Sequence, residues 1–163
     1  MEEKGRTRRE GVTAGLIGAT AVALWFFVAD LIAGQPLYTP IALGSALQGF
    51  FGATSVASAP LTVLMYTVFH YLAFILVGLI VSAVFNAAER EPSILAGFAI
   101  LFVMLELASL GLVVLVQESS VLRSIAWYQI GAANLVASIS MGTYLVRAHR
   151  GIMKRVGLSI GGI

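Results

Sequence analysis

The sequence contains four continuous apolar stretches, at residues 11–34, 61–86, 93–116 and 125–146. Each is longer than the ~20 residues that a helix needs to cross ~30 Å of hydrocarbon. Helices are the only option for these segments, because a membrane β-barrel shows short strands of alternating polarity. The chain is 59% hydrophobic and 11% charged, and its 163 residues leave no room for a separate soluble domain. The sequence therefore predicts an all-α integral membrane protein with four transmembrane helices in a bundle.

Basic residues fall on one side of this four-span arrangement, whereas the opposite side has only Arg123. Because positively charged segments stay in the cytoplasm, the pattern predicts an N-in/C-in topology. A basic N-terminus at 1–10 and a basic tail at 147–163 then flank a transmembrane domain at 11–146. The compact loops indicate a multi-pass protein of the bacterial inner (cytoplasmic) membrane. The basic residues on the cytoplasmic side are Lys4, Arg6, Arg8, Arg9, Arg90, Arg147, Arg150, Lys154 and Arg155.

The connection between the first two spans contains a further uncharged segment. Thr39 is expected to cap a short helix, at about 40–55, which Pro40 opens. Small and polar side chains share one face of this helix, and apolar ones share another. This division predicts a helix at the outer interface or a re-entrant one. The alternative is a fifth span at 40–57, which would place the two basic termini on opposite sides of the membrane.

Two stripes of small residues predict where the helices pack. Apolar lipid drives helix association only weakly, so close contacts in membranes depend on small side chains and hydrogen bonds. We expect each stripe to form a packing seam, and self-association in a homo-oligomer is the alternative. Bulky substitution at Gly15 or Ser138 should weaken assembly. The stripes are Gly11, Gly15, Gly18 and Ala21 in the first span, and Gly131, Asn134, Ser138 and Gly142 in the fourth.

Five polar residues of the predicted spans form a candidate intramembrane cluster: Asp30, His70, Glu106, Gln129 and Asn134. Ionisable groups are costly in hydrocarbon and normally have partners or a function. At 1.5 Å per helical residue, His70, Glu106 and Asn134 reach one layer, between the midplane and the outer leaflet. They are therefore predicted to be mutual partners. Asp30 lies near the outer end of its helix and is expected to be structural, and Gln129 lies between it and that layer.

Several function classes lack support in the sequence. The chain has no cysteine, no nucleotide loop and no catalytic or metal-ligand spacing, so we predict neither an enzyme nor a cofactor. Nucleic acid is not an expected partner, because the basic residues lie mostly at the chain ends without interleaved aromatics. His149 lies among those terminal basic residues and is expected to face lipid headgroups. A metal site built from His70, Glu106 and Asp30 is disfavoured, because Asp30 lies too far from the other two along the membrane normal.

Three functions remain open from the sequence. The first is a non-catalytic accessory or assembly subunit, in contact with lipid and with other membrane subunits, whose polar cluster fixes helix packing. The second is a proton-coupled transporter of small solutes that uses Glu106 and His70. The third is a redox subunit that binds haem or quinone. In that case a single chain supplies only His70 within a span, so a methionine or another subunit would have to complete a haem site.

Overall fold

The computed structural model describes residues 2–52, 57–91 and 127–149, together with positions 93, 94, 96, 98, 99, 102 and 103. Within this part of the chain there is no strand. Four helices are defined: α1 (Glu2–Ile32), α2 (Tyr38–Phe50), α3 (Ala59–Ala88) and α6 (Trp127–Ala148). The prediction of an all-α chain is confirmed for these residues. Most of the predicted span at 93–116 lies outside the described residues, and so does Glu106.

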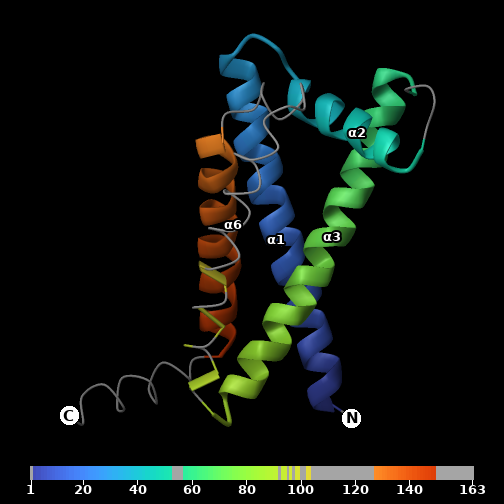
Figure 1. Cartoon of the computed structure of the whole chain (residues 1–163). Helices are drawn as coiled ribbons and strands as arrows, with labels where there is room; N and C mark the ends of the chain where they lie inside the picture. Colours follow the sequence, from blue (N-terminus) through green and yellow to red (C-terminus); the bar gives the residue numbers. More distant parts are fainter. Residues whose placement is uncertain are drawn as a thin grey trace.

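Helix α1 lies between α3 and α6 and packs against both, whereas α3 and α6 hardly touch (Figure 1). The segments Gly5–Ile32 and Ala59–Ala88 are long and apolar enough to cross a membrane. Helix α1 begins much earlier than the expected residue 11. The basic N-terminus continues this helix, supported by an ion pair between Arg6 and Glu10 one turn apart, at 3.1 Å.

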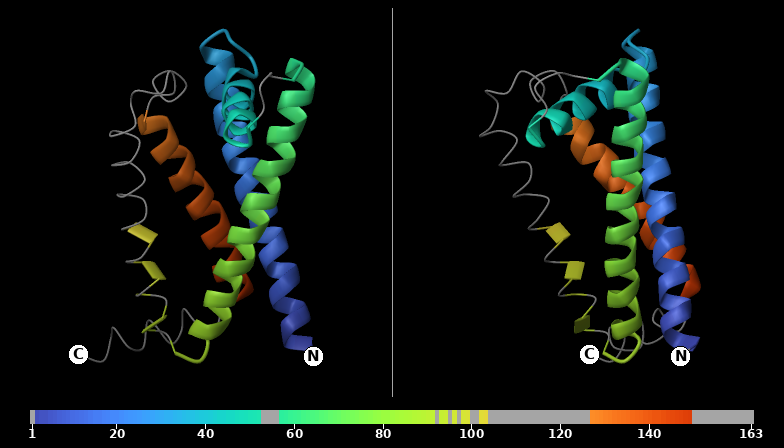
Figure 2. Two further views of the ribbon diagram at one scale, coloured as in Figure 1. Left: turned by 45° about the vertical axis from the view of Figure 1, so that its right-hand side comes forward. Right: turned by 90° about the vertical axis from the view of Figure 1, so that its right-hand side faces the viewer.

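Helices α1 and α3 cross close to the N-terminal end of α1 and separate towards α2 (Figures 1 and 2). Glycine makes this crossing possible. A Cβ atom added to Gly15 would lie 2.5 Å from the Cα of Ile75, and one added to Gly11 would lie 2.7 Å from the Cα of Leu79. From the other side, a Cβ on Gly78 would collide with the backbone of Gly11 and Gly15. Gly11 and Gly15 of the first stripe therefore pack against α3, backbone on backbone, whereas Gly18 faces Met141 of α6.

Helix α6 contacts α1 through a row of residues spaced by four. Ala133, Ala137, Met141 and Leu145 are all buried, and Met141 packs where Gly18 leaves space. The predicted stripe on α6 occupies a neighbouring, half-buried face. A Cβ on Gly142 would meet nothing within 4 Å, and the Ser138 hydroxyl donates to the carbonyl of Asn134 in its own helix. A packing role for that stripe stays a prediction.

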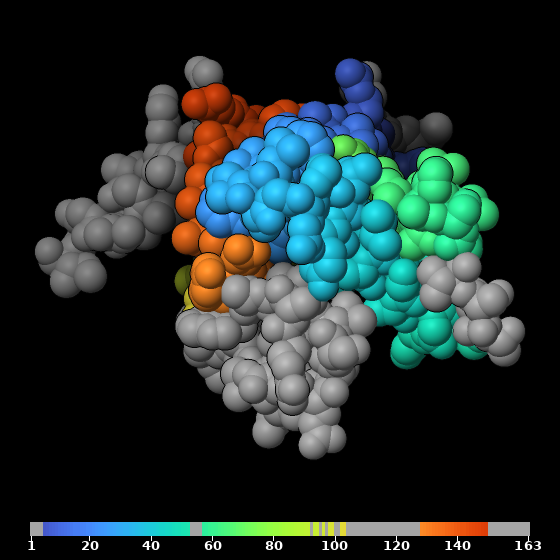
Figure 3. Space-filling model, turned by 90° about the horizontal axis from the view of Figure 1, so that it is seen from above, coloured from blue at the N-terminus to red at the C-terminus, as the bar shows by residue number. Residues whose placement is uncertain are grey.

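Helix α2 is a short helix that crosses from the end of α1 to the start of α3. With 13 residues it is ~20 Å long, too short for a fifth span. The expected cap at Thr39 is wrong. The N-cap is Leu37, which has a left-handed backbone (φ 66°) and makes no side-chain cap bond. Seen from this end, α2 (cyan) lies beside the end of α1 (blue) and the start of α3 (green) (Figure 3).

Candidate functional site

A cavity of about 280 Å³ opens between α1, α2 and α3, where the two long helices separate. We call it the α1–α2–α3 cavity. Its walls are mainly apolar and include Phe26, Leu37 and Val63. The polar side chains on its lining are Thr20, Asp30, Thr39, Tyr66, Thr67, His70 and Tyr71. Apolar pockets with a few convergent polar groups are the usual form of small-molecule sites.

His70 lies on the wall of this cavity and is 9% exposed. Its Nε2 lies 3.1 Å from the carbonyl oxygen of Ala19 in α1. A carbonyl oxygen can only accept, so Nε2 carries the proton and donates. The imidazole is surrounded by rings, with centroids 5.7 Å from Tyr66 and 4.8 Å from Phe74. His70 thus ties α3 to α1.

Asp30 is 5% exposed and joins the end of α1 to the first turn of α2. Its Oδ2 accepts from the Thr39 backbone N–H at 2.8 Å, and its Oδ1 accepts from the Thr39 hydroxyl at 2.7 Å. The N-terminus of a helix carries unpaired N–H groups and partial positive charge. The carboxylate of Asp30, in α1, therefore caps the N-terminus of α2. A residue directly before the helix normally has this role.

Gln48 makes the corresponding connection from α2 to α3. Its side-chain nitrogen donates to the Thr62 hydroxyl at 3.0 Å, and its oxygen accepts from the backbone N–H of Ala57 at 2.9 Å. Gly44 allows this approach, because a Cβ there would lie 2.7 Å from Cγ2 of Thr62. Both ends of α2 are thus held by buried polar contacts.

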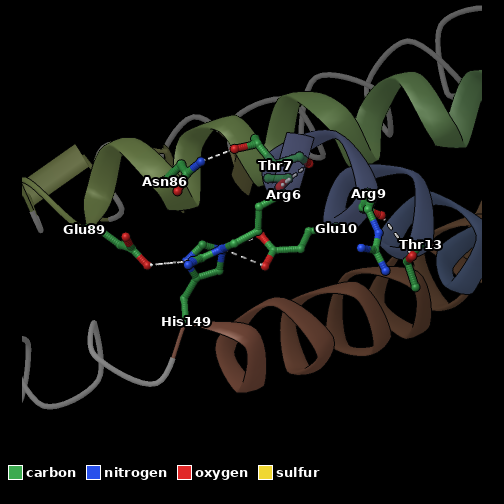
Figure 4. A network of polar contacts seen from close by, with 9 residues as sticks. Arg6, Thr7, Arg9, Glu10, Thr13, Asn86, Glu89 and His149 are labelled. Carbon is green, nitrogen blue, oxygen red and sulfur yellow. Dashed lines mark hydrogen bonds and ion pairs between the residues drawn. The ribbon is translucent and has the colours of Figure 1, made fainter. Parts of the chain in front are cut away.

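A second polar group lies at the opposite end of the molecule, where α1 begins and α3 and α6 end (Figure 4). We call Arg6, Glu10, Glu89 and His149 the His149 cluster. The imidazole Nε2 lies 3.0 Å from Oε2 of Glu10, and Nδ1 lies 2.6 Å from Oε1 of Glu89. Arg6 adds contacts of 3.1 Å to Glu10 and 3.2 Å to Glu89. One arginine, one histidine and two acidic side chains therefore join three helix ends.

The expectation that His149 faces lipid headgroups is wrong, because the residue is 2% exposed. Its position follows from helical spacing. His149 comes one step of four after Leu145 and so continues the buried row of α6. The sequence held this signal, together with two acids, Glu10 and Glu89, that lie beside the ends of predicted spans. Beside this cluster, the Ser82 hydroxyl donates to the Thr7 carbonyl at 3.0 Å, and Asn86 donates to the Thr7 hydroxyl.

Within this cluster, the pKa of Glu89 is lowered from its ordinary value. The hydrogen bond from His149 is the largest cause, and the positive charges of His149 and Arg6 add to it. Burial acts in the opposite direction but is outweighed. Both ring nitrogens of His149 face carboxylate oxygens, which can only accept while ionised. The geometry therefore places the imidazole ring between the two carboxylates.

The predicted polar layer is only partly described. His70 lies against α1, whereas Asn134 lies on α6 beyond α1, and no hydrogen bond joins the two. Gln129 lines a groove between α1 and α6, beside Trp25. The predicted partnership with Glu106 falls outside the described residues. Asp30 is the one member of the five whose partners are fully defined, and they belong to α2.

Among the residues that the structure describes, no three His, Cys, Asp or Glu side chains are grouped to hold a metal ion. The contacts of Asp30, His70 and His149 join different elements of the fold. Comparison of the chain with protein-family models, curated proteins and solved structures finds no match.

Proposed function

We propose that this chain is a non-catalytic accessory or assembly subunit of a membrane complex. Its polar side chains fix how its helices pack. The observation that carries the proposal is the His149 cluster, which joins the ends of α1, α3 and α6. The pairs Asp30–Thr39 and Gln48–Thr62 act in the same way on α2. Polar groups arranged as interhelical ties favour a rigid scaffold over a reactive centre.

The proposed setting is a bundle of four membrane-spanning helices in the inner membrane of a bacterium, with both termini in the cytoplasm. The apolar segments Gly5–Ile32 and Ala59–Ala88 support it. So does the location of the start of α1 and the end of α6 at one end of the molecule (Figure 1). Arg8, Arg9 and Arg147 are exposed at that end, as the positive-inside rule requires.

Single-cysteine labelling tests this orientation, because the natural chain contains no cysteine. Gln35→Cys, in the turn before α2, should react with a membrane-impermeant maleimide on spheroplasts. Gly5→Cys, at the opposite end, should react only after the membrane is permeabilised. Labelling of both variants from the same side would contradict a membrane-spanning α1, and the reversed pattern would contradict the proposed orientation.

Extraction from native membranes in a mild detergent tests the function. The wild-type chain should elute with a partner in a fixed ratio, in a particle heavier than the 17.2 kDa chain and its detergent. His149→Ala loosens three helix ends and should reduce partner recovery, whereas Leu76→Ala, on an exposed face, should not. Recovery of the chain alone, or solute flux in proteoliposomes that Glu106→Gln abolishes, would contradict the proposal.

A further inference from the structure

The α1–α2–α3 cavity contains two polar groups to which no described residue binds. His70 uses Nε2 to donate to Ala19, so a neutral imidazole presents Nδ1 as an acceptor. The Tyr66 hydroxyl, one helical turn before it, likewise has no hydrogen-bond partner in the described part of the chain. The two rings stack at 5.7 Å with an interplanar angle of 27°. The two rings that carry this acceptor and this donor are thus neighbours on the cavity lining.

The other polar groups on the lining are already engaged. Thr20 and Tyr71 bond to each other through their hydroxyls at 3.0 Å. The Asp30 carboxylate is bound twice by Thr39, and the Thr67 hydroxyl donates to the carbonyl of Val63. Both oxygens of Asp30, the acid on this lining, are thus hydrogen-bonded to Thr39. Polar groups inside proteins are normally hydrogen-bonded, so Nδ1 of His70 and the Tyr66 hydroxyl, which have no partner among the described residues, are informative.

We infer that the cavity binds a neutral amphiphile with a hydroxyl head and an apolar body. A hydroxyl can donate to Nδ1 of His70 and accept from the Tyr66 O–H at once, whereas an ether or a ketone can only accept. The apolar body suits the walls formed by Phe26, Phe27 and Val63. At about 280 Å³ the cavity is just below the usual range of small-molecule pockets, about 300–1,000 Å³. It holds the head and the first part of the body.

Nitrogen NMR on the full chain in lipid nanodiscs tests the assignment. The chain has two histidines, so isotope-labelled histidine gives few resonances, and His149→Ala assigns those of His70. Titration with dodecanol should shift the Nδ1 resonance of His70. Dodecyl methyl ether has the same apolar body without the O–H donor, and it should shift this resonance much less.

Two tyrosine variants separate recognition of the head from filling of the cavity. Tyr66→Phe removes the proposed donor and should weaken dodecanol binding about threefold to tenfold, as expected for one hydrogen bond. Tyr71→Phe changes the same lining at a hydroxyl already bonded to Thr20, and it should weaken the affinity less than Tyr66→Phe does. Equal loss in both variants would contradict the assignment.

The wild-type protein alone keeps the inference falsifiable if a variant fails to fold. Equal responses to dodecanol and to its methyl ether would overturn it, as would no response to either. Movement of the Nδ1 resonance of His70 on Glu106→Gln, without any probe present, would show that the Glu106 carboxyl already binds this nitrogen, as a protonated acid that donates to it. That result would also overturn the inference, while leaving the proposed accessory function intact.

Discussion

Single side chains decide how α2 is joined to the rest of the molecule. Leu37 offers no side-chain cap, so the first turn of α2 depends on a carboxylate from another helix. Asp30 serves this purpose because it lies at the last turn of α1, within reach of the Thr39 N–H and hydroxyl. A negative charge at a helix N-terminus is favourable in itself. The acid is therefore explained without any role in catalysis or transport.

Asp30→Ala removes both hydrogen bonds and leaves Thr39 buried without a partner. Hydrogen bonds to charged groups contribute about 1.5–3 kcal/mol, so we expect a loss of about 2 kcal/mol in unfolding free energy. Asp30→Asn keeps the shape and one acceptor oxygen, and it should lose less. Thermal unfolding in detergent measures both variants. An Asp30→Ala protein as stable as wild type would show that this contact does not hold α2.

The lowered pKa of Glu89 predicts how stability depends on pH. A carboxyl whose pKa is lower in the folded state stabilises the fold fully above its unfolded value, 4.5, and less as pH falls through the folded value. Wild type should therefore lose melting temperature below pH 4.5 by more than Glu89→Gln does, since the amide does not titrate. If the melting temperatures of the two proteins fell equally across this pH range, the His149 contact would not be the cause of the lowered pKa of Glu89.

At the scale of helices, the crossing of α1 and α3 depends on the absence of side chains. Gly11 and Gly15 meet Gly78 so closely that backbone contacts backbone. Such proximity favours dispersion contacts, which drive helix association where the hydrophobic effect contributes little. The crossing near one end also opens the cavity at the other, because straight helices that cross there must diverge.

Gly15→Ala tests the crossing with one added carbon atom. The new Cβ would lie 2.5 Å from Cα of Ile75, which cannot move without its helix, and overpacking of this kind costs about 1–3 kcal/mol. Gly5→Ala is the matched control, because a Cβ there meets nothing within 4 Å. Melting temperatures in detergent should fall only for the first variant. Equal effects of the two substitutions would show that close contact at Gly15 does not stabilise the crossing of α1 and α3.

The sequence was informative about elements and much less so about partners. Apolar length predicted helices close to α3 and α6, and the GxxxG spacing pointed to the packing face of α1. Depth along a helix did not reveal neighbours, because His70 and Asn134 lie on opposite sides of α1. The role of His149 was not predicted, because a histidine among terminal basic residues is expected to face lipid headgroups. Its four-residue spacing from Leu145 was the better guide.

Across the whole molecule, polar ties lie at both ends and the glycine crossing lies between them. The Asp30 and Gln48 contacts fix α2 over one end, and the His149 cluster fixes three helix ends at the other. Hydrogen bonds between membrane helices contribute only about 0.6 kcal/mol on average. Several such contacts are therefore needed to hold the helices in one arrangement. A single arrangement gives the molecule a fixed surface, which the proposed assembly role requires.

The central claim is that these buried polar groups hold helices together, and a double-mutant cycle between His149 and Glu10 tests it most directly. The two residues join α6 to α1 at 3.0 Å. Unfolding free energies are compared for wild type, His149→Ala, Glu10→Ala and the double variant. We predict that each single variant is less stable, and that the double variant loses less than the sum by about 0.6 kcal/mol or more. Additive losses, or single variants as stable as wild type, would contradict the claim.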